Sequence, residues 1–490
     1  MMYRTVAQLD SAMGFLAGFW PSYFTRITLP ENSIQGRPVH ALRLRAGTAT
    51  NRRAVLMVAG THSRELMNPD ALLEVAIDLM VSHINNSDIA YGGFSMPADT
   101  TKTILESLDL WFVPCINPDG RHHAMTRDDL WRKNLRDNTS SACDGVDLNR
   151  NSDFVFGVAQ GATSCSPCAD TYCGPHAFSE PETRNVRWLL DMGQVVTFVD
   201  VHSFSELVLW PWGHAPSQST DPSKVFTTLP TGTCSASIPA SYAEYLPPRD
   251  HQRLSTVGQR ISEAIAQVRG RQYTSQASLD LYATTGTLDD YAFGRHIANP
   301  ALGKTYGFTF ETGPDTGNIR ESFHPADPEP IKLDAKAGLL TLMQQSICAI
   351  DFIGAKSRTA LAGVRVAREL RDQRLARTPA GRAWIGFVEE LSPSVAAAAI
   401  RRPALVKRGR SLLTRLATLA DDPRATLTDQ DLTQVANLLD DLGQVASHHR
   451  ESVEVCRAAL NGLAGLTLDQ AVTRLGRRSS PAREDATTAP

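Results

Sequence analysis

A histidine and a glutamate stand three positions apart directly after an apolar run near the start of the chain. The run AVLMVAG (54–60) is followed by His62 and Glu65 within the segment GTHSRE (60–65). One turn of chain can aim side chains at this spacing at the same point, and an imidazole and a carboxylate are both zinc ligands. A capped helix start or a surface ion pair gives the same spacing, so this pair alone leaves those interpretations open.

A third candidate ligand, His202, follows another apolar run. The run VVTFVDVH (195–202) reads as a buried strand that ends in this histidine, and open α/β sheets bind ligands beyond the carboxyl ends of their strands. Two imidazoles and one carboxylate leave the fourth position of a zinc tetrahedron to water, which is the pattern of catalytic zinc. His62, Glu65 and His202 therefore predict a hydrolase with one zinc ion per chain.

A further carboxylate ends a later apolar run. In TYGFTFE (305–311) the last residue is Glu311, and both burial and a nearby metal would change the pKa of such a group. We predict that Glu311 is a general base. Without other motifs, a glutamate that only ends a strand or pairs with a surface arginine would explain the pattern equally well.

Three more motifs give these residues a context. They are NPDG (117–120), WRKN (131–134) and GVDLNRN (145–151). Together with the segments above, they resemble the zinc carboxypeptidase family of the A/B type, from about Tyr3 to Phe352. The resemblance implies a metallocarboxypeptidase that hydrolyses the C-terminal peptide bond with a metal-activated water.

The resemblance also implies the roles of the catalytic residues. His62, Glu65 and His202 would hold the zinc ion. Glu311 would take a proton from water and pass it to the leaving amine, and Arg132 of WRKN would face the carbonyl oxygen that is attacked.

The resemblance places the substrate's free carboxylate against Asn149 and Arg150. A guanidinium group suits a carboxylate because it can donate two parallel hydrogen bonds. Tyr282 matches the family's mobile tyrosine, which covers the bound terminus, although a packed loop aromatic is the alternative. Asp147 matches an acid that hydrogen-bonds one zinc-bound imidazole, that of His62, and fixes its tautomer.

Two further positions match substrate-subsite residues of the family, and a third is expected to set side-chain preference. The first two are Arg64 and Ser203; Phe204 follows Ser203 where the family often has tyrosine. Asp289 stands seven positions after the tyrosine, where carboxypeptidase B-like members carry an acid, so we predict a preference for C-terminal Lys or Arg. Asp290 is the alternative acid, and bulky apolar residues are the alternative substrate class.

Other functions on the same scaffold stay open. The protein could trim cell-wall or γ-glutamyl peptides, although Asp289 disfavours acidic side chains. It could also be a non-catalytic peptide-binding protein, which the complete set of catalytic residues argues against. The family-like region begins almost at the first residue, so we expect a protein made without an inhibitory pro-segment.

The elements that must position these residues alternate between strands and helices. We expect buried strands at 54–60, 108–116, 195–202 and 305–311, and helices at 69–84 and 179–193. Ser179 and Glu182 fit a capping box with Pro181 in the first turn. This order predicts an α/β fold, with a mixed, mostly parallel sheet covered by helices on both faces.

The character of the chain changes after residue 354. Helical periodicity fills 356–377, 381–400, 404–420, 428–447 and 450–476, and no strong strand pattern remains. We therefore predict a catalytic domain over 1–354, an all-helical region of unknown role over 355–478, and a disordered tail over 479–490.

Composition excludes several classes of protein. With 490 residues, 42% hydrophobic and 21% charged, the chain has the composition of a globular protein, not of a disordered one. No apolar stretch is long enough to span a membrane, and the basic residues of the helical region are interleaved with acids. We expect peptide or protein C-termini as partners, with neither nucleic acid nor a membrane; the oligomeric state is left open.

The cysteines and the N-terminus point to different compartments. Cys143, Cys165, Cys168 and Cys173 crowd one segment, where disulfides or free thiols are favoured over a metal. The resemblance implies a Cys143–Cys168 disulfide, and Cys165 with Cys173 is a candidate second pair. A disulfide would suit an extracellular site, whereas the lack of a recognisable signal peptide slightly favours the cytoplasm.

Overall fold

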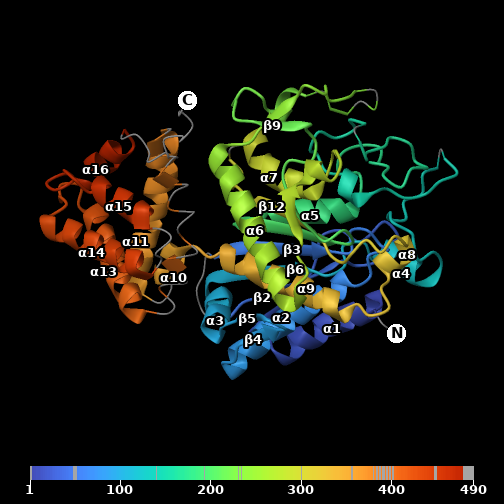
Figure 1. Cartoon of the computed structure of the whole chain (residues 1–490), viewed down its shortest axis with the longest axis horizontal. Coiled ribbons are helices and arrows are strands. Elements are labelled where there is room, and N and C mark those ends of the chain that lie inside the picture. Colours follow the sequence, from blue (N-terminus) through green and yellow to red (C-terminus); the bar gives the residue numbers. More distant parts are fainter. Residues whose placement is uncertain are drawn as a thin grey trace. The chain divides into compact units, whose positions relative to one another are not determined.

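The chain forms two compact units. The computed structural model describes residues 3–477 except 48–51, 140, 160, 193, 230, 233, 235, 300, 355, 356, 379, 382, 383, 386, 387, 389–391, 393, 394, 397, 398, 400, 401 and 446–449. The units are Met1–Ser346 and Ile347–Pro490 (Figure 1). The division thus lies slightly before the boundary expected at 354, and the expected tail over 479–490 lies outside the described residues.

The first unit is built on an eight-stranded mixed sheet. Its strand order is β1-β2-β6-β3-β7-β12-β8-β11. The strands are β1 (Phe24–Thr28), β2 (His40–Leu44), β6 (Leu108–Val113), β3 (Arg53–Ala59), β7 (Val195–His202), β12 (Tyr306–Glu311), β8 (Leu207–Trp210) and β11 (Thr274–Ala277).

The four strands expected from the sequence form the centre of this sheet. β6, β3, β7 and β12 are neighbours and run parallel to one another. Their apolar runs are continuous because both faces of a central parallel strand are covered. Parallel strands end at the same edge, so the residues at the ends of β3, β7 and β12 are brought together.

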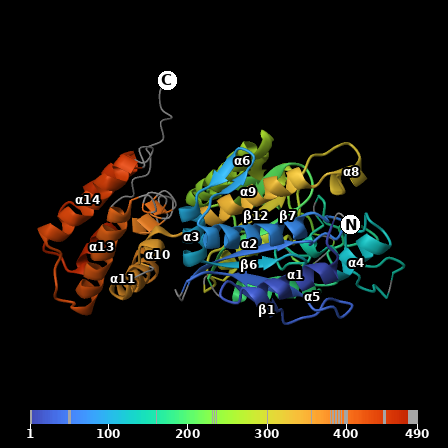
Figure 2. The same ribbon diagram turned by 90° about the horizontal axis from the view of Figure 1, so that it is seen from below.

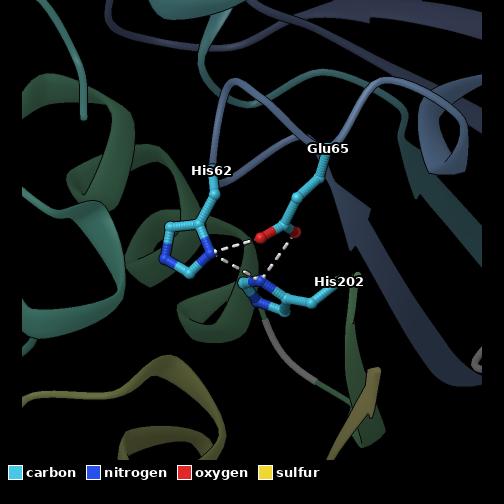
Figure 3. Close-up of side chains that lie close together, drawn as sticks. All are labelled: His62, Glu65 and His202. Carbon is cyan, nitrogen blue, oxygen red and sulfur yellow. Dashed lines mark hydrogen bonds and ion pairs between the residues drawn. The ribbon is translucent and has the colours of Figure 1, made fainter. Parts of the chain in front are cut away.

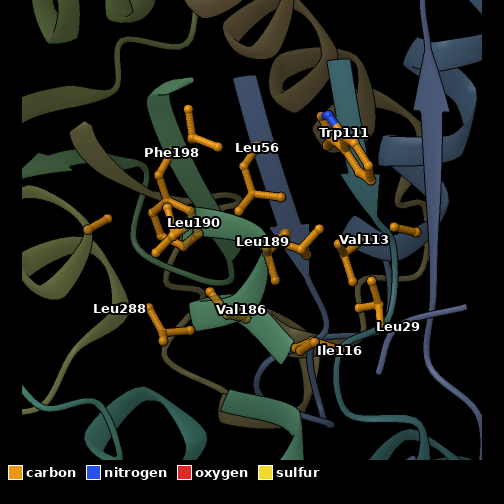
Figure 4. Packing of buried hydrophobic residues seen from close by; sticks show 14 of the residues in the cluster. Leu29, Leu56, Trp111, Val113, Ile116, Val186, Leu189, Leu190, Phe198 and Leu288 are labelled. Atoms are coloured by element: carbon orange, nitrogen blue, oxygen red, sulfur yellow. The ribbon is translucent and has the colours of Figure 1, made fainter. Parts of the chain in front are cut away.

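Helices cover both faces of the sheet, as predicted. Figure 2 shows α2 (Asn68–Asn85), α6 (Pro248–Arg269) and α9 (Glu329–Gln345) on one side, and α5 (Pro181–Asp191) on the other. α7 (Leu288–Ala298) lies on the same side as α5. In Figure 4, Val186, Leu189 and Leu190 of α5 pack against Leu56 and Phe198 of the sheet.

The remaining elements of the first unit are short or peripheral. They are α1 (Val6–Phe19), α3 (Ala98–Ser107), α4 (Pro118–Thr126), α8 (Ile319–Phe323), and the short strands β4 (Ile89–Tyr91), β5 (Phe94–Met96), β9 (Ser217–Ser219) and β10 (Ala243–Tyr245). Three 3-10 turns complete the unit, η1 (Leu148–Arg150), η2 (Phe226–Thr228) and η3 (Ser278–Asp280).

The capping box expected at the start of α5 is wrong. The N-cap residue is Glu180, and its side chain makes no capping hydrogen bond. Ser179 donates instead to the Glu180 carboxylate, and Glu182 accepts hydrogen bonds from the backbone of Ile34 and from Asn134. The side chains of Ser179 and Glu182 are therefore bound by other partners and do not form the capping box.

The second unit is helical, as predicted. Its described helices include α10 (Ala349–Gly354), α11 (Arg358–Glu369), α13 (Pro403–Asp421), α14 (Asp429–Val445), α15 (Arg450–Ala459) and α16 (Leu468–Leu475). The helix expected over 450–476 is two helices, because Gly462 and Gly465 adopt left-handed backbone angles between them. In the described part of the chain, no helix is long and apolar enough to cross a membrane.

Candidate active site

Three side chains predicted as metal ligands converge at the carboxyl edge of the sheet. His62 and Glu65 lie on the turn that follows β3, and His202 is the last residue of β7 (Figure 3). The turn is fixed by the Ser63 amide, which donates to the Arg132 carbonyl at 3.1 Å, and by the Ser63 hydroxyl, which donates to the Trp131 carbonyl at 2.6 Å.

The donor atoms of the three residues face one another. Nδ1 of His62 lies 2.8 Å from Oε1 of Glu65 and 2.9 Å from Nδ1 of His202, which in turn lies 3.1 Å from Oε2 of Glu65. All three residues are buried. Two imidazoles and one carboxylate aimed at a common point fit the ligand set of a catalytic zinc ion.

Each imidazole has a buried carboxylate behind it. Oδ1 of Asp147 lies 3.1 Å from Nε2 of His62, as expected for the acid that fixes its tautomer. Burial alone would raise the pKa of Asp147, but the charges of Arg132 and His62 lower it well below its usual range. Oδ2 of Asp200 lies 2.8 Å from Nε2 of His202.

Sequence reasoning missed Asp200. The signal was present in the segment Asp200-Val201-His202, because alternate residues of a strand point to the same face. An acid two positions before a strand-end histidine can therefore reach its ring.

Arg132 and Glu311 line the same cavity as the metal ligands His62 and Glu65. Arg132 is anchored by Asp147, whose Oδ2 accepts from Nε at 3.0 Å and from Nη2 at 2.8 Å. Glu311 ends β12 directly beside His202 in the register of the sheet. Burial raises the pKa of Glu311 to about 8, although the charge of His202 opposes this shift. Glu311 is thus a carboxyl group that can both accept and return a proton.

A cavity of about 310 Å³ joins these residues to the predicted substrate-binding residues. It is lined by two ligands, both catalytic candidates and all six substrate-binding candidates: His62, Glu65, Arg132, Glu311, Arg64, Asn149, Arg150, Ser203, Tyr282 and Asp289. His202 and Asp147 stand directly behind the lining, in contact with His62. The structure therefore brings all twelve predicted site residues into one region.

Arg150 is held in place by backbone carbonyl groups. Its Nε donates to the Ala162 carbonyl at 2.9 Å and its Nη1 to the Asn149 carbonyl at 2.7 Å. The side-chain oxygen of Asn149 accepts from the Leu288 amide at 3.0 Å. Gly286 permits this packing, because a Cβ at that position would lie 2.2 Å from the Arg150 carbonyl oxygen. The guanidinium of Arg150, held in this way, belongs to a residue that lines the cavity.

Tyr282 lies on a loop and is exposed to solvent. It follows η3 on a loop, and 44% of its surface is exposed although it lines the cavity. The alternative interpretation, an aromatic side chain packed into its loop, does not fit such exposure.

Asp289 is a buried carboxylate in the lining of the cavity. Its side chain is 3% exposed, and its Oδ2 accepts from the Ser278 hydroxyl at 3.2 Å. Thr284, Thr287 and Thr309 also line this cavity. Of these, Thr284 and Thr287 lie in the same segment as Asp289, whereas Thr309 comes from β12.

Arg64 and two aromatic rings border the cavity on another side. The guanidinium of Arg64 lies over the Phe323 ring, 4.5 Å from its centroid, and Phe204 packs edge-on against Phe323 at 4.9 Å. Ser203 lines the cavity, and its amide donates to Oε2 of Glu65 at 3.1 Å. The backbone of Ser203 thus also orients a metal ligand.

Two disulfides brace the loop that carries Ala162. Cys143 pairs with Cys168, as expected, but Cys165 pairs with Cys234. The pairing of Cys165 with Cys173 is therefore wrong, and Cys173 is a buried free thiol. Folding brings the distant Cys234 to Cys165, a contact that local spacing could not indicate.

Comparisons with known proteins agree with this geometry. The family model for zinc carboxypeptidase matches residues 16–334. Carboxypeptidase A1 of Bos taurus is 30% identical over 347 residues, 70% of each chain. An inactive metallocarboxypeptidase of Ajellomyces dermatitidis is 30% identical over 222 residues, 44% of this chain and 35% of that protein. The crystal structure of thrombin activatable fibrinolysis inhibitor shares the fold, with 22% identity and a TM-score of 0.56 over 70% of this chain and 74% of that one.

Proposed function

Since this chain belongs to the zinc carboxypeptidase family, we propose that it removes lysine or arginine from the C-terminal ends of peptides. The family makes it a metallocarboxypeptidase. The observation that carries the finer proposal is the buried carboxylate of Asp289 in the lining of the cavity.

His62, Glu65 and His202 would hold the zinc ion of the family. A zinc ion bound there supplies a Lewis acid that activates water and polarises the carbonyl group of the substrate. The Glu311 carboxylate takes the proton of the attacking water and returns it to the nitrogen of the leaving amine. Arg132 lies beside the oxygen that gains negative charge, where its fixed guanidinium stabilises the transition state.

Arg150 and Asn149 would bind the free α-carboxylate of the substrate. The support is the guanidinium of Arg150, which two carbonyl groups hold in place and which belongs to a residue of the cavity lining. A charge-assisted pair of this kind requires a terminal carboxylate, which restricts the enzyme to the last residue of a chain. Tyr282, on its exposed loop, would then close over the bound residue.

Asp289 would select the side chain of that last residue. In the described part of the chain no lysine or arginine pairs with Asp289, so a cationic substrate side chain is its natural partner. An apolar side chain would leave this carboxylate buried and unpaired, which is costly. The hydroxyl groups of Ser278, Thr284 and Thr309 in the lining of the same cavity further favour a side chain with several N–H donors.

The test is hydrolysis of N-blocked dipeptides that differ only in the last residue. We expect kcat/KM for C-terminal Arg and Lys to exceed that for Phe and Glu by roughly a hundredfold, the worth of about 3 kcal/mol from a buried ion pair. Faster hydrolysis of Phe would overturn the basic preference while leaving the carboxypeptidase activity in place. Cleavage of none of the four would point to a specialised peptide substrate.

A further inference from the structure

Asp200 and His202 form a buried pair behind the predicted metal site. Both belong to β7 and point to the same face of the sheet because they are two positions apart. Oδ2 of Asp200 lies 2.8 Å from Nε2 of His202, and both side chains are 1% exposed. The ring nitrogen that faces Asp200 is the one turned away from Glu65.

A hydroxyl group fixes the carboxylate of Asp200 in turn. Oγ1 of Thr61 lies 2.9 Å from each carboxylate oxygen and donates to them. Thr61 immediately precedes His62, so this contact joins the turn after β3 to the end of β7. Neither Asp200 nor Thr61 is among the residues that line the cavity, so any effect of Asp200 on the site is expected to act through His202.

The proton on a neutral imidazole decides which nitrogen can bind a metal. A carboxylate next to Nε2 favours the tautomer with hydrogen on Nε2, and Nδ1 then carries a free lone pair. Nδ1 is the atom of His202 that faces Glu65 and His62. Asp147 likewise faces Nε2 of His62, where the two atoms form a hydrogen bond at 3.1 Å; Asp200 and Nε2 of His202 form a close ion-pair contact.

We propose that Asp200 is a positioning residue of the metal site, which holds the His202 ring with Nδ1 toward the metal and is itself oriented by Thr61. This inference rests on the proposed role of His202 as a zinc ligand. It assigns one carboxylate to each histidine, Asp147 to His62 and Asp200 to His202.

The test is the zinc affinity of the full chain with Asp200→Asn, measured on metal-free protein by competition with a chromophoric chelator. Asparagine keeps the shape but removes the charge, and we expect zinc affinity to fall 10- to 100-fold, the usual effect of losing such a partner. Asp147→Asn is the comparison for His62. Asp250→Asn is the matched control, because Asp250 is a buried carboxylate that pairs with Lys304 and Tyr306, and it should keep the wild-type affinity.

Thermal unfolding separates positioning from a purely structural role. A ligand that binds the folded state raises its stability according to its affinity. If Asp200 positions the ligand, the variant narrows the difference in Tm between zinc-loaded and metal-free protein. If Asp200 only supports the fold, the Tm of the zinc-loaded variant and the Tm of the metal-free variant fall by the same amount, and the proposal is overturned.

The outcomes also separate this proposal from the proposed function. Absence of zinc binding by the wild type would remove the assigned metal site itself. Wild-type affinity in Asp200→Asn, with weakened binding in Asp147→Asn, would overturn only the role of Asp200. If Asp200→Asn does not fold, Thr61→Val decides: we expect a smaller loss of zinc affinity, and wild-type affinity in that variant would contradict the proposal.

Discussion

Asp289 and Asp290 are consecutive residues, yet only Asp289 lines the cavity. Both carboxylate oxygens of Asp290 accept instead from the backbone amide of Gly213, at 3.2 and 3.0 Å. Their position in the first turn of α7 turns them in different directions. Asp289, and not its neighbour, is therefore placed to contact a substrate side chain.

This difference predicts opposite results for two matched variants. Asp289→Asn should lower kcat/KM for C-terminal Arg roughly a hundredfold, the cost of leaving a buried cation unpaired, with little effect on Phe. Asp290→Asn should leave the ratio of Arg to Phe unchanged. The measurement is kcat/KM on the two dipeptides. A loss of the Arg preference only in Asp290→Asn would show that Asp290, and not Asp289, selects the substrate side chain.

Asp290 should make stability depend on pH. Burial, followed by the nearby charge of Asp289, raises the pKa of Asp290 well above 3.8. The folded protein then keeps a proton that the unfolded chain has released, so stability falls as the pH rises from 3.8 toward the raised pKa. Asparagine cannot ionise, so the Tm of Asp290→Asn should rise relative to wild type between pH 4 and pH 8.

Scanning calorimetry checks this trend. Asp88→Asn is the control, since Asp88 is exposed, and its Tm should follow that of the wild type at every pH. A constant difference between Asp290→Asn and wild type over the whole range would show that Asp290 does not hold a proton in the folded state.

Glu311→Gln should remove the proton transfer without removing the metal site. Glu311 is not one of the three grouped ligands, so zinc content should be that of the wild type. We expect kcat to fall by roughly 10² to 10⁴, the range for loss of a general base. Undiminished turnover in this variant, with zinc bound, would contradict the assigned mechanism.

The Cys165–Cys234 disulfide should support substrate binding through Arg150. The loop it braces supplies the Ala162 carbonyl that accepts from Arg150. Replacing both cysteines by serine should raise KM more than it lowers kcat, and loss of a disulfide typically also costs about 2–5 kcal/mol of stability. The Cys143–Cys168 double variant, which opens the other disulfide of the same loop, is measured in the same assay. An unchanged KM in both variants would show that neither disulfide supports substrate binding.

The sequence was sufficient to predict those elements whose pattern lies within a single stretch of chain. The central strands β6, β3, β7 and β12 are continuous apolar runs, because they are buried on both faces. The outer strands β1, β2, β8 and β11 were not predicted. They are short, and β1 and β11 mix polar with apolar residues because they lie at the edges of the sheet.

The parts of the site that escaped prediction depend on long-range contacts. The pairing of Cys165 with Cys234 joins segments that are 69 residues apart in the chain. Ser179 and Glu182 had the spacing of a capping box, but tertiary partners bind both side chains. Asp200 is different, since its alternation with His202 was visible in the sequence.

The most direct measurement of the central claim is release of free arginine from one peptide under four conditions. The peptide ends in arginine, with a free or an amidated terminus, and each form is assayed with and without a zinc chelator. We predict release only from the free terminus without chelator, and recovery when zinc is added back. Release that survives the chelator, or release from the amidated peptide, would contradict a zinc-dependent enzyme that recognises the terminal carboxylate.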